Sequence, residues 1–564
     1  MRQDFAPEQL DEPPLVRSRV RNRAAAAALI DNGEERALTQ WWRDAAIYQI
    51  YPRSFQDATG DGIGDLAGIR SRLDYLRELG VGAVWLSPIF RSPMADFGYD
   101  IADYRAIDPL FGDMDAFDRL LQQAHGRGLK ILLDFVPNHT SDRHPWFQES
   151  RSSRDNSKRD WYIWKDAAPR GGPPNNWIGN FGGSAWEWDG ATGQYYYHAF
   201  LKEQPDLNWR NPQVREAMHD VLRFWLDKGV DGFRIDVIWH LAKDTRFRDN
   251  PPNPAWEPGQ PEIDRLRQKY SADQPFVHEI VAELRDVVEE YGDRLLIGEI
   301  YLPLDRLVTY YGKGDEGLHL PFNFQLLQAP WRAEVIRDLI AQYEAALPEH
   351  GWPNWVLSNH DKPRIAARVG QAQARIAAML LLTLRGTPTL YYGDELGIGD
   401  VAIPPDRIQD PWARNEPDAS FNRDKARTPM QWSPEGHAGF SDAEPWLPLT
   451  EDWETRNVQC QREDGGSMLR LHRALLALRA RHADLREGDY RPLDAGAPLL
   501  AYRRGERMAV VLNLSAEPAE LELPEEWRDC EVLLRASSGE TGGAVPSRLD
   551  GDEGVILLRR EEAA

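Results

Sequence analysis

The sequence predicts an α/β protein: a closed (β/α)8 TIM barrel with an inserted subdomain after its third strand and a C-terminal antiparallel β domain. From residue 41 onward, short apolar segments alternate with amphipathic helical segments, which is the pattern of parallel βαβ units. Eight such units in one sheet close into a barrel. The alternation is interrupted once, after the third strand. It gives way after residue 486 to short strands separated by turn residues, which is typical of an antiparallel domain.

Eight segments carry the strand pattern of the barrel. The first, AIYQIY, is short and apolar, and no GxGxxG follows it, which argues against the alternative of a doubly wound open sheet. The sixth, GLHLPFNF, is weaker than the other seven. In chain order the segments are residues 46–51, 81–88, 129–139, 231–237, 294–300, 317–324, 354–361 and 387–395.

Amphipathic segments between these strands predict the outer layer of helices. Their apolar residues recur at helical spacing, and Gly80 and Gly128 close two of them. The clearest helical segments are residues 68–80, 115–128, 212–230, 279–291 and 468–482.

The domain organisation follows from these changes of pattern. Residues 1–40 have no strand pattern and are expected to form an N-terminal extension, either a short helix or a partly disordered segment. The barrel is assigned to residues 41–139 and 209–486. Residues 140–208, rich in Trp, Gly, Pro and Asn, are expected to form an inserted subdomain B, and residues 487–564 a C-terminal β-sandwich domain.

Composition argues against several classes of partner. The 564-residue chain has 67 basic and 90 acidic side chains, and its net charge of −23 repels nucleic acids and anionic membranes. No stretch approaches the roughly 20 apolar residues of a membrane span. The start, MRQDFAPEQLDEPP, lacks the basic and apolar regions of a signal peptide. Because Cys460 and Cys530 are the only cysteines, we expect no disulfide framework and a cytoplasmic location.

Polar residues gather where the predicted strands end, and the active sites of barrels lie at those carboxyl ends. Several carboxylates in one funnel repel each other, a cost that is tolerated when one must be ionised and another protonated. Glycoside hydrolysis requires such a pair around the glycosidic bond. The residues at the strand ends are Asp134, Asn138, His139, Arg234, Asp236, Glu299, His360 and Asp361, and the loop after the second strand adds Asp96, Tyr99 and Asp100.

Sequence motifs support the same chemistry. AIYQIYPRSF, DGIGDL, ADFGYDIADY, DFVPNHTS, QPDLNW, GFRIDV, IGEIY, SNHDKPR, TPTLYYGDELG and ARTPMQW occur in this order. With these motifs the chain resembles glycoside hydrolase family 13, the α-amylase family, in its α-glucosidase and oligo-1,6-glucosidase branch. The resemblance runs from about Trp41 to the C-terminus and does not cover the first 40 residues.

The resemblance implies a role for each residue of the site. Asp236 would be the nucleophile, Glu299 the general acid and base, and Asp361 the carboxylate that binds ring hydroxyls of the glucose. Asp236 and Glu299 are expected to lie about 5–5.5 Å apart, the spacing of a retaining enzyme. Phe181, Phe200 and Gln204 match family positions around the pocket, but core packing of subdomain B explains them equally well. The implied substrate-binding residues are Asp96, Tyr99, His139, Phe181, Phe200, Gln204, Arg234 and His360.

A second site is indicated by DATGDGIGD at residues 57–65, where acids alternate with glycines as in an oxygen-only Ca²⁺ loop. The resemblance implies a structural Ca²⁺ or Mg²⁺ here, and no cofactor for catalysis. Thr59 replaces the usual Asn, and a capped turn without an ion is the alternative. The ligand positions are Asp57, Thr59, Asp61, the Ile63 carbonyl and Asp65.

Taken together, these features predict a retaining, exo-acting α-glucosidase that hydrolyses short α-glucosides and transfers glucose to other hydroxyls as a side reaction. We expect a dead-end pocket, closed beyond the glucose by subdomain B and Asp96. Val237 follows the nucleophile, and the resemblance associates Val at this position with α-1,6 activity. The first alternative is a sucrose- or maltose-active transferase or isomerase of the trehalose synthase type. The second, a non-enzymatic homologue, is disfavoured because the three carboxylates are present.

Overall fold

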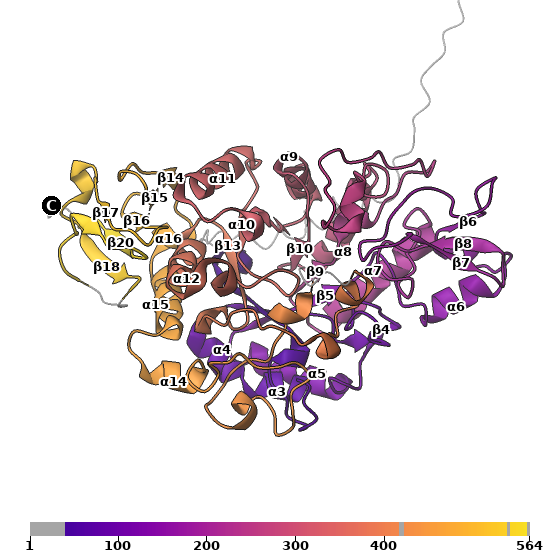
Figure 1. The fold of residues 1–564 in the computed structure, drawn as a ribbon, viewed down its shortest axis with the longest axis horizontal. Helices are drawn as coiled ribbons and strands as arrows, with labels where there is room; N and C mark the ends of the chain where they lie inside the picture. Colours follow the sequence, from indigo (N-terminus) through magenta and orange to yellow (C-terminus); the bar gives the residue numbers. More distant parts are fainter. Residues whose placement is uncertain (1–39, 417–421, 538–541, 561–564) are drawn as a thin grey trace, which may run out of the picture. The chain divides into compact units, whose positions relative to one another are not determined.

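The structure is a computed structural model that describes residues 40–416, 422–537 and 542–560, and residues from Trp42 onward form one compact unit. The helix or disorder expected within residues 1–40 lies outside the described residues, apart from Gln40. All eight predicted barrel strands are present in one sheet, in the order β11-β10-β9-β5-β2-β1-β13-β12 (Figure 1). Their bounds are β1 Ile47–Ile50, β2 Ala83–Leu86, β5 Lys130–Phe135, β9 Gly232–Ile235, β10 Leu295–Gly298, β11 Leu320–Pro321, β12 Asn354–Val356 and β13 Thr387–Tyr391.

The sheet closes on itself. Hydrogen-bonded neighbours in this sheet are parallel, and an isolated parallel bridge between Asn323 and Trp355 joins its two outer strands, β11 and β12. The prediction of a barrel is therefore confirmed, and the doubly wound open sheet is wrong. The weak sixth strand is real but short, Leu320–Pro321, and the Phe322 amide after it still donates to the Gly298 carbonyl of β10 at 2.8 Å.

Helices cover the outside of the barrel. The segment predicted as one helix at 68–80 forms two, α3 (Leu66–Ser71) and α4 (Leu73–Leu79), separated at Arg72. Asp65 caps the first by accepting from the Gly68 amide, and Gly80 ends the second in a left-handed conformation with φ 99°. The other main helices are α5 Met114–His125, α7 Pro212–Asp227, α8 Val277–Glu289, α11 Ala333–Ala346, α12 Ile365–Thr383 and α15 Met468–Arg481.

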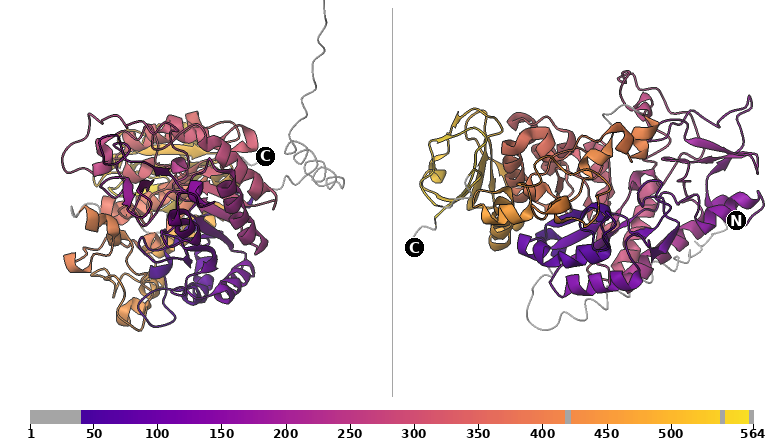
Figure 2. Two further views of the ribbon diagram at one scale, coloured as in Figure 1. Left: turned by 90° about the vertical axis from the view of Figure 1, so that its right-hand side faces the viewer. Right: turned by 60° about the horizontal axis from the view of Figure 1, so that its bottom comes forward.

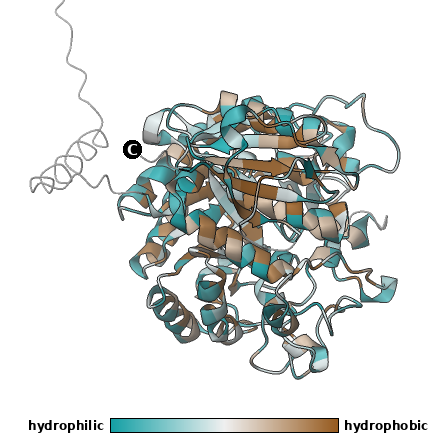
Figure 3. Ribbon diagram, turned by 90° about the vertical axis from the view of Figure 1, so that its left-hand side faces the viewer, coloured by the Kyte–Doolittle hydropathy of each residue, from teal (hydrophilic) through white to brown (hydrophobic). Residues whose placement is uncertain are grey.

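The described part of 140–208 contains a three-stranded antiparallel sheet, and residues from 487 contain two further antiparallel sheets. These two regions flank the barrel on opposite sides (Figures 1 and 2). Figure 3 views the protein from the side of the C-terminal region. The strands in this view are largely hydrophobic, whereas many loops and outer helix surfaces are hydrophilic. The strands are β6 Trp164–Lys165, β7 Trp186–Asp189 and β8 Gln194–Tyr197 in the first region, and β14 Tyr490–Pro492, β15 Leu500–Arg504, β16 Met508–Leu512, β17 Ala519–Glu520, β18 Glu531–Arg535, β19 Arg548–Leu549 and β20 Gly554–Leu558 in the second.

A buried ammonium group fixes the 140–208 region to the barrel. Lys243 follows β9, and its Nζ donates to Asn138 Oδ1 at 2.8 Å and to the Asp206 carboxylate. The Lys243 and Asp206 side chains are only 3% and 0% exposed. Asn138 follows β5 and Asp206 ends the inserted region, so this contact joins the two boundaries of the insertion next to the strand ends.

No helix in the described ranges is long and apolar enough to cross a membrane.

Because the eight strands are parallel, their carboxyl ends all open at one end of the barrel. The residues that follow β5, β9, β10 and β12 therefore meet there, although they are far apart in the sequence.

Candidate active site

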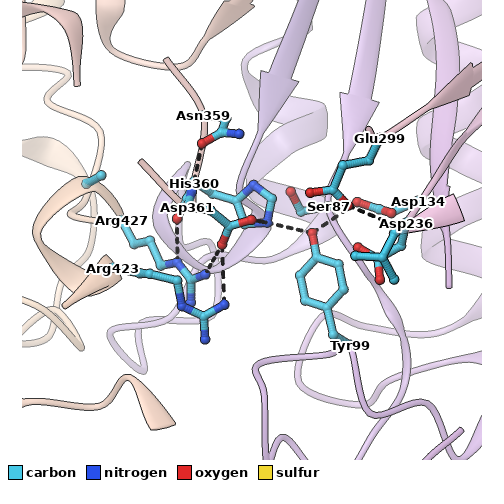
Figure 4. A network of polar contacts seen from close by, with 12 residues as sticks. Ser87, Tyr99, Asp134, Asp236, Glu299, Asn359, His360, Asp361, Arg423 and Arg427 are labelled. Atoms are coloured by element: carbon cyan, nitrogen blue, oxygen red, sulfur yellow. Dashed lines mark hydrogen bonds and ion pairs between the residues drawn. The ribbon is translucent and has the colours of Figure 1, made fainter. Parts of the chain in front are cut away.

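A cavity of about 700 Å³ opens at the carboxyl ends of the strands. Most predicted site residues line it, whereas Arg234 and His360 lie behind it, buried against the lining carboxylates. Figure 4 shows the Tyr99 hydroxyl between two groups of side chains: Asp134, Asp236 and Glu299 on one side, and His360 and Asp361 on the other. The predicted residues in the lining are Asp96, Tyr99, His139, Phe181, Phe200, Gln204, Asp236, Glu299 and Asp361.

One guanidinium organises the first group. Arg234, on β9, points its Nη1 at Asp134 Oδ1 (2.7 Å) and Asp236 Oδ1 (2.8 Å), and its Nη2 at Glu299 Oε2 (2.8 Å). Burial alone would lower the pKa of Arg234, but the charges of Asp134 and Glu299 raise it well above its ordinary value. Arg234 is therefore a permanent cation that three buried carboxyl groups share.

The two carboxyl groups on either side of this cation have raised pKa values. Burial raises the pKa of Asp236 well above its ordinary value; Arg234 opposes the rise and Glu299 adds to it. Burial likewise raises the pKa of Glu299. The charge of Arg234 lowers this pKa, and the charge of Asp361 raises it. Burial thus favours a proton on one of the two groups, the condition for one group to act as an acid and the other as a base. The distance between the carboxyl groups of Asp236 and Glu299 stays a prediction.

The backbone after Asp236 also contacts Glu299. Val237 has φ 37° and ψ 45°, a left-handed conformation that is strained for a β-branched residue. In this conformation its N–H donates to Glu299 Oε2 at 2.8 Å. The strain therefore accompanies a contact that orients the second carboxyl group of the pair.

Asp361 is held by two arginines that our sequence analysis did not single out. Arg427 Nη2 and Arg423 Nη1 lie 2.8 Å and 3.3 Å from Asp361 Oδ1 (Figure 4). Burial opposes ionisation of Asp361, but His360 and the two arginines hold its pKa below the ordinary value. Arg427 lies inside the ARTPMQW motif and Arg423 lies three residues before it, so the motif was the available signal, although it does not reveal their partner.

The same Arg423 also lines the cavity, next to Asp96. Its Nη2 donates to Asp96 Oδ1 at 2.8 Å and to Asp410 Oδ1 at 2.8 Å, and Gln204 Nε2 lies 3.4 Å from the other Asp96 oxygen. Phe181 stacks on Trp412 with ring centroids 5.6 Å apart. Asp96, Arg423 and Gln204 thus form a polar part of the lining next to the Phe181–Trp412 pair, and closure of the pocket beyond one sugar stays a prediction.

The two histidines are neutral. Burial lowers the pKa of His139 and of His360 to about 3. His139 Nδ1 lies 3.1 Å from Asn138 Nδ2, and His360 Nε2 lies 2.7 Å from the Tyr99 hydroxyl. A neutral imidazole can donate a hydrogen bond to a sugar hydroxyl without adding charge to the site.

The predicted metal loop has the right donor chemistry but is already hydrogen-bonded internally. Asp57 accepts from the amides of Thr59, Gly60 and Gly62 and from Ser441, and Asp65 accepts from those of Ala58, Thr59 and Gly68. Asp61 accepts from the Ile63 amide. Among the described residues, no three acidic, His or Cys side chains are grouped around a metal position. The loop is a satisfied turn that an ion would have to reorganise, and its occupancy stays a prediction.

Comparisons with known proteins agree with this arrangement. The family profile described as "Alpha amylase, catalytic domain" matches residues 49–488, and "Domain of unknown function (DUF3459)" matches residues 485–556. This chain belongs to the α-amylase family of glycoside hydrolases.

Individual relatives cover nearly the whole chain. An α-glucosidase of Culex pipiens is 40% identical over 90% of this chain and 88% of that protein. An oligo-1,6-glucosidase of Halalkalibacterium halodurans is 39% identical over 93% of this chain and 100% of that protein. The crystal structure of the α-glucosyl transfer enzyme XgtA matches with a TM-score of 0.87 at 44% identity, covering 92% of this chain and 99% of that one.

The raised pKa values predict a bell-shaped pH dependence of kcat/KM. Activity is lost at low pH as Asp236 is protonated, at a pH above the ordinary carboxyl range because burial raises its pKa. It is lost at high pH as Glu299 gives up its proton. Since the charge of Asp134 contributes to the raised pKa of Asp236, Asp134→Asn should move the acid limb to lower pH. A profile of kcat/KM measured for both proteins tests this, and an unmoved acid limb contradicts it.

Proposed function

We propose that this protein is a retaining, exo-acting α-glucosidase that releases terminal α-linked glucose from short oligosaccharides. The observation that carries the proposal is the pair Asp236 and Glu299 on one guanidinium, in a cavity that the Asp96–Arg423 ion pair also lines. The carboxyl pair suits double displacement, and the Asp96–Arg423 pair suits binding of the end of a sugar chain. The activity of the relatives, named α-glucosidase and oligo-1,6-glucosidase, supports the same assignment.

In the proposed mechanism, a carboxylate oxygen of Asp236 attacks C1 of the terminal glucose, and the bond from C1 to the leaving oxygen breaks. Glu299 gives its proton to that oxygen. Glu299, now ionised, takes a proton from water, whose oxygen attacks C1 and releases Asp236. Two inversions at C1 give net retention. General acid catalysis of this kind contributes about 10²–10⁴-fold.

The remaining residues bind and orient the sugar in this proposal. Asp361, kept ionised by Arg423 and Arg427, accepts from ring hydroxyls, while neutral His139 and His360 donate to them. Tyr99 stacks on the ring. Asp96, tied to Arg423, binds a hydroxyl at the closed end.

Proton NMR of the sugar released from 4-nitrophenyl α-glucoside tests the proposal. The first glucose to appear should be the α-anomer, before mutarotation mixes the two forms. Initial β-glucose indicates an inverting enzyme, and no hydrolysis of any α-glucoside removes the glucosidase assignment.

A second candidate is a glucosyltransferase or isomerase, favoured by the similarity to the α-glucosyl transfer enzyme XgtA. The covalent intermediate can pass glucose to any hydroxyl that replaces water, so the same site serves both reactions. Chromatography of products from maltose and from sucrose separates the two. Mostly free glucose supports the hydrolase, whereas longer or isomeric disaccharides as main products support the transferase.

Substrate size and linkage give a further prediction. Because only one sugar fits beyond the scissile bond, maltose and isomaltose should both be hydrolysed and starch should be a poor substrate. Val237 lies in the cavity lining beside Asp236, where a methyl-scale contact discriminates by about 1–3 kcal/mol. Val237→Ala should therefore lower the ratio of isomaltose to maltose rates by about 10-fold. An unchanged ratio, or maltose cleavage without isomaltose cleavage, contradicts this role of Val237.

The metal site is proposed as structural. With Asp57, Asp61, Asp65 and the Ile63 carbonyl as oxygen ligands, Ca²⁺ should raise the Tm, and a chelator should lower it more than it lowers the rate at room temperature. Asp61→Ala removes an exposed acid and should abolish the response to Ca²⁺. If neither chelator nor Ca²⁺ changes the Tm of the unaltered protein, the loop is a turn without an ion.

We also propose a cytoplasmic location, since both cysteines are free in the structure and the sequence contains no others.

A further inference from the structure

Gln49 is a buried polar residue inside the barrel that does not line the cavity. It lies on β1, is 0% exposed, and its amide nitrogen contacts two side chains from other strand ends. Nε2 lies 2.9 Å from His360 Nδ1 and 3.2 Å from the Ser87 hydroxyl oxygen. The residue thus touches a neutral histidine of the site from the side opposite the substrate.

The chemistry of this contact decides where His360 carries its proton. An amide NH₂ group only donates, so His360 Nδ1 must accept. Because burial lowers the pKa of His360 to about 3, the ring carries a single proton, and that proton is therefore on Nε2.

A second line of evidence leads to the same tautomer without reference to Gln49. The Tyr99 hydroxyl has one hydrogen, and it donates to Asp134 Oδ2 at 3.1 Å. Its oxygen, 2.7 Å from His360 Nε2, must then accept from that nitrogen. Asp361 Oδ2, another acceptor, lies 3.4 Å from the same nitrogen. With the Gln49 amide nitrogen toward Nδ1, the contacts of Gln49, Tyr99 and Asp361 all favour a proton on Nε2.

We propose that Gln49 is a positioning residue that holds His360 in the Nε2–H tautomer, so that its single N–H donates to Tyr99 in the free protein and is available to a sugar hydroxyl when substrate binds. Hydrogen bonds thereby run in one direction, from Gln49 through His360 and Tyr99 to Asp134. Without the amide, the neutral ring can place its proton on Nδ1, and Nε2 then presents a lone pair to the sugar hydroxyl. The role of His360 as a donor to substrate rests on the proposed function.

Two substitutions separate this role from packing. Gln49→Leu removes the donor and leaves the tautomer unspecified, and we expect kcat/KM to fall about 10- to 100-fold, as is usual when the partner of a functional side chain is lost. Gln49→Glu replaces the donor with a carboxylate that accepts from Nδ1–H. A neutral ring then has no proton on Nε2. A carboxylate next to a histidine raises its pKa, as Asp361 already does, against burial and the charges of Arg427, Arg234 and Arg423, which lower it. The doubly protonated ring donates again from Nε2.

The sign of the expected pH effect follows from this. In Gln49→Glu, activity should be preserved where His360 is doubly protonated and should fall as pH rises through its raised pKa. The pH optimum therefore moves to lower pH, whereas Gln49→Leu loses activity without such a shift. A purely structural role of Gln49 predicts a lowered Tm in both variants and no difference between their pH profiles.

Gln431 provides a matched control. It is also 0% exposed, and its Nε2 donates only to the Thr450 hydroxyl, at 2.6 Å. Gln431→Glu and Gln431→Leu make the same changes at a buried glutamine that contacts no histidine. Whatever their effect on Tm, they should leave the shape of the pH profile unchanged.

The tautomer itself can be observed in the unaltered protein. Nitrogen NMR of ¹⁵N-histidine-labelled protein, with His360 assigned by its absence in His360→Ala, should show a proton on Nε2 and a bare Nδ1. A proton on Nδ1 overturns the proposal, as does Gln49→Leu with unchanged kcat/KM and pH profile. Because this spectrum needs no turnover, it separates failure of the inference from failure of the glucosidase assignment.

Discussion

Asp236→Asn should reduce turnover of every α-glucoside by on the order of 10⁴-fold or more, since losing a residue that acts as part of a catalytic unit has effects of this size. The amide cannot form the covalent intermediate. Asp134 is bound to the same guanidinium at 2.7 Å but does not line the cavity. Asp134→Asn is therefore the matched control, expected to cost only about 10- to 100-fold, as for a residue that supports the site without reacting.

Glu299→Gln distinguishes the two carboxyl groups from each other. It removes the proton donor, so cleavage of maltose should fall about 10²–10⁴-fold. With 4-nitrophenyl α-glucoside, whose leaving group needs no proton, the first step should survive and a burst of 4-nitrophenol should precede slow turnover. Added azide should speed that turnover and give α-glucosyl azide. A burst in Asp236→Asn and none in Glu299→Gln would mean that the two roles are exchanged.

Lys243→Met should be the most destabilising single change outside the reacting groups, at about 3–5 kcal/mol, because it leaves the buried Asp206 carboxylate without its counter-ion. Burial raises the pKa of Asp206 and lowers that of Lys243, so both charges depend on each other. Calorimetry and urea unfolding measure the loss. Removing Lys243 raises the folded-state pKa of Asp206 further, so the deficit should shrink as pH falls and the carboxyl takes up a proton.

Two further variants make this prediction specific. Lys158 pairs with Glu149 at 2.7 Å within the inserted region, but Glu149 is 48% exposed, so Lys158→Met should cost no more than about 1 kcal/mol. The double variant Lys243→Met with Asp206→Asn should recover part of the loss, because the uncompensated charge is gone. Equal losses in the free energy of unfolding for Lys243→Met and Lys158→Met would show that the buried pair stabilises the protein no more than the exposed pair does.

Local sequence was a good guide to the barrel and to three carboxylates that line its cavity, whose catalytic roles stay predictions. Strand and helix periodicity located the eight strands, and motifs at their ends contained Asp236, Glu299 and Asp361. It was a poorer guide where tertiary contacts compete with local pattern. The helix predicted at 68–80 breaks at Arg72, whose side chain bonds Gln56 at 2.8 Å and covers the Trp432 ring at 4.2 Å. The sixth strand, weak in the sequence, is only two residues long in the structure.

By itself, the sequence determined which segments are strands, which polar residues stand at their carboxyl ends, and hence the class of chemistry, because burial periodicity and short motifs are local properties. Only the tertiary structure decided the partners of those residues. Arg423 reaches Asp96 from 327 positions away, and Gln49 reaches His360 across 311. Such pairs form because closing the barrel brings the strands together around one axis, and no local pattern encodes which side chains then meet or where the protons between them lie.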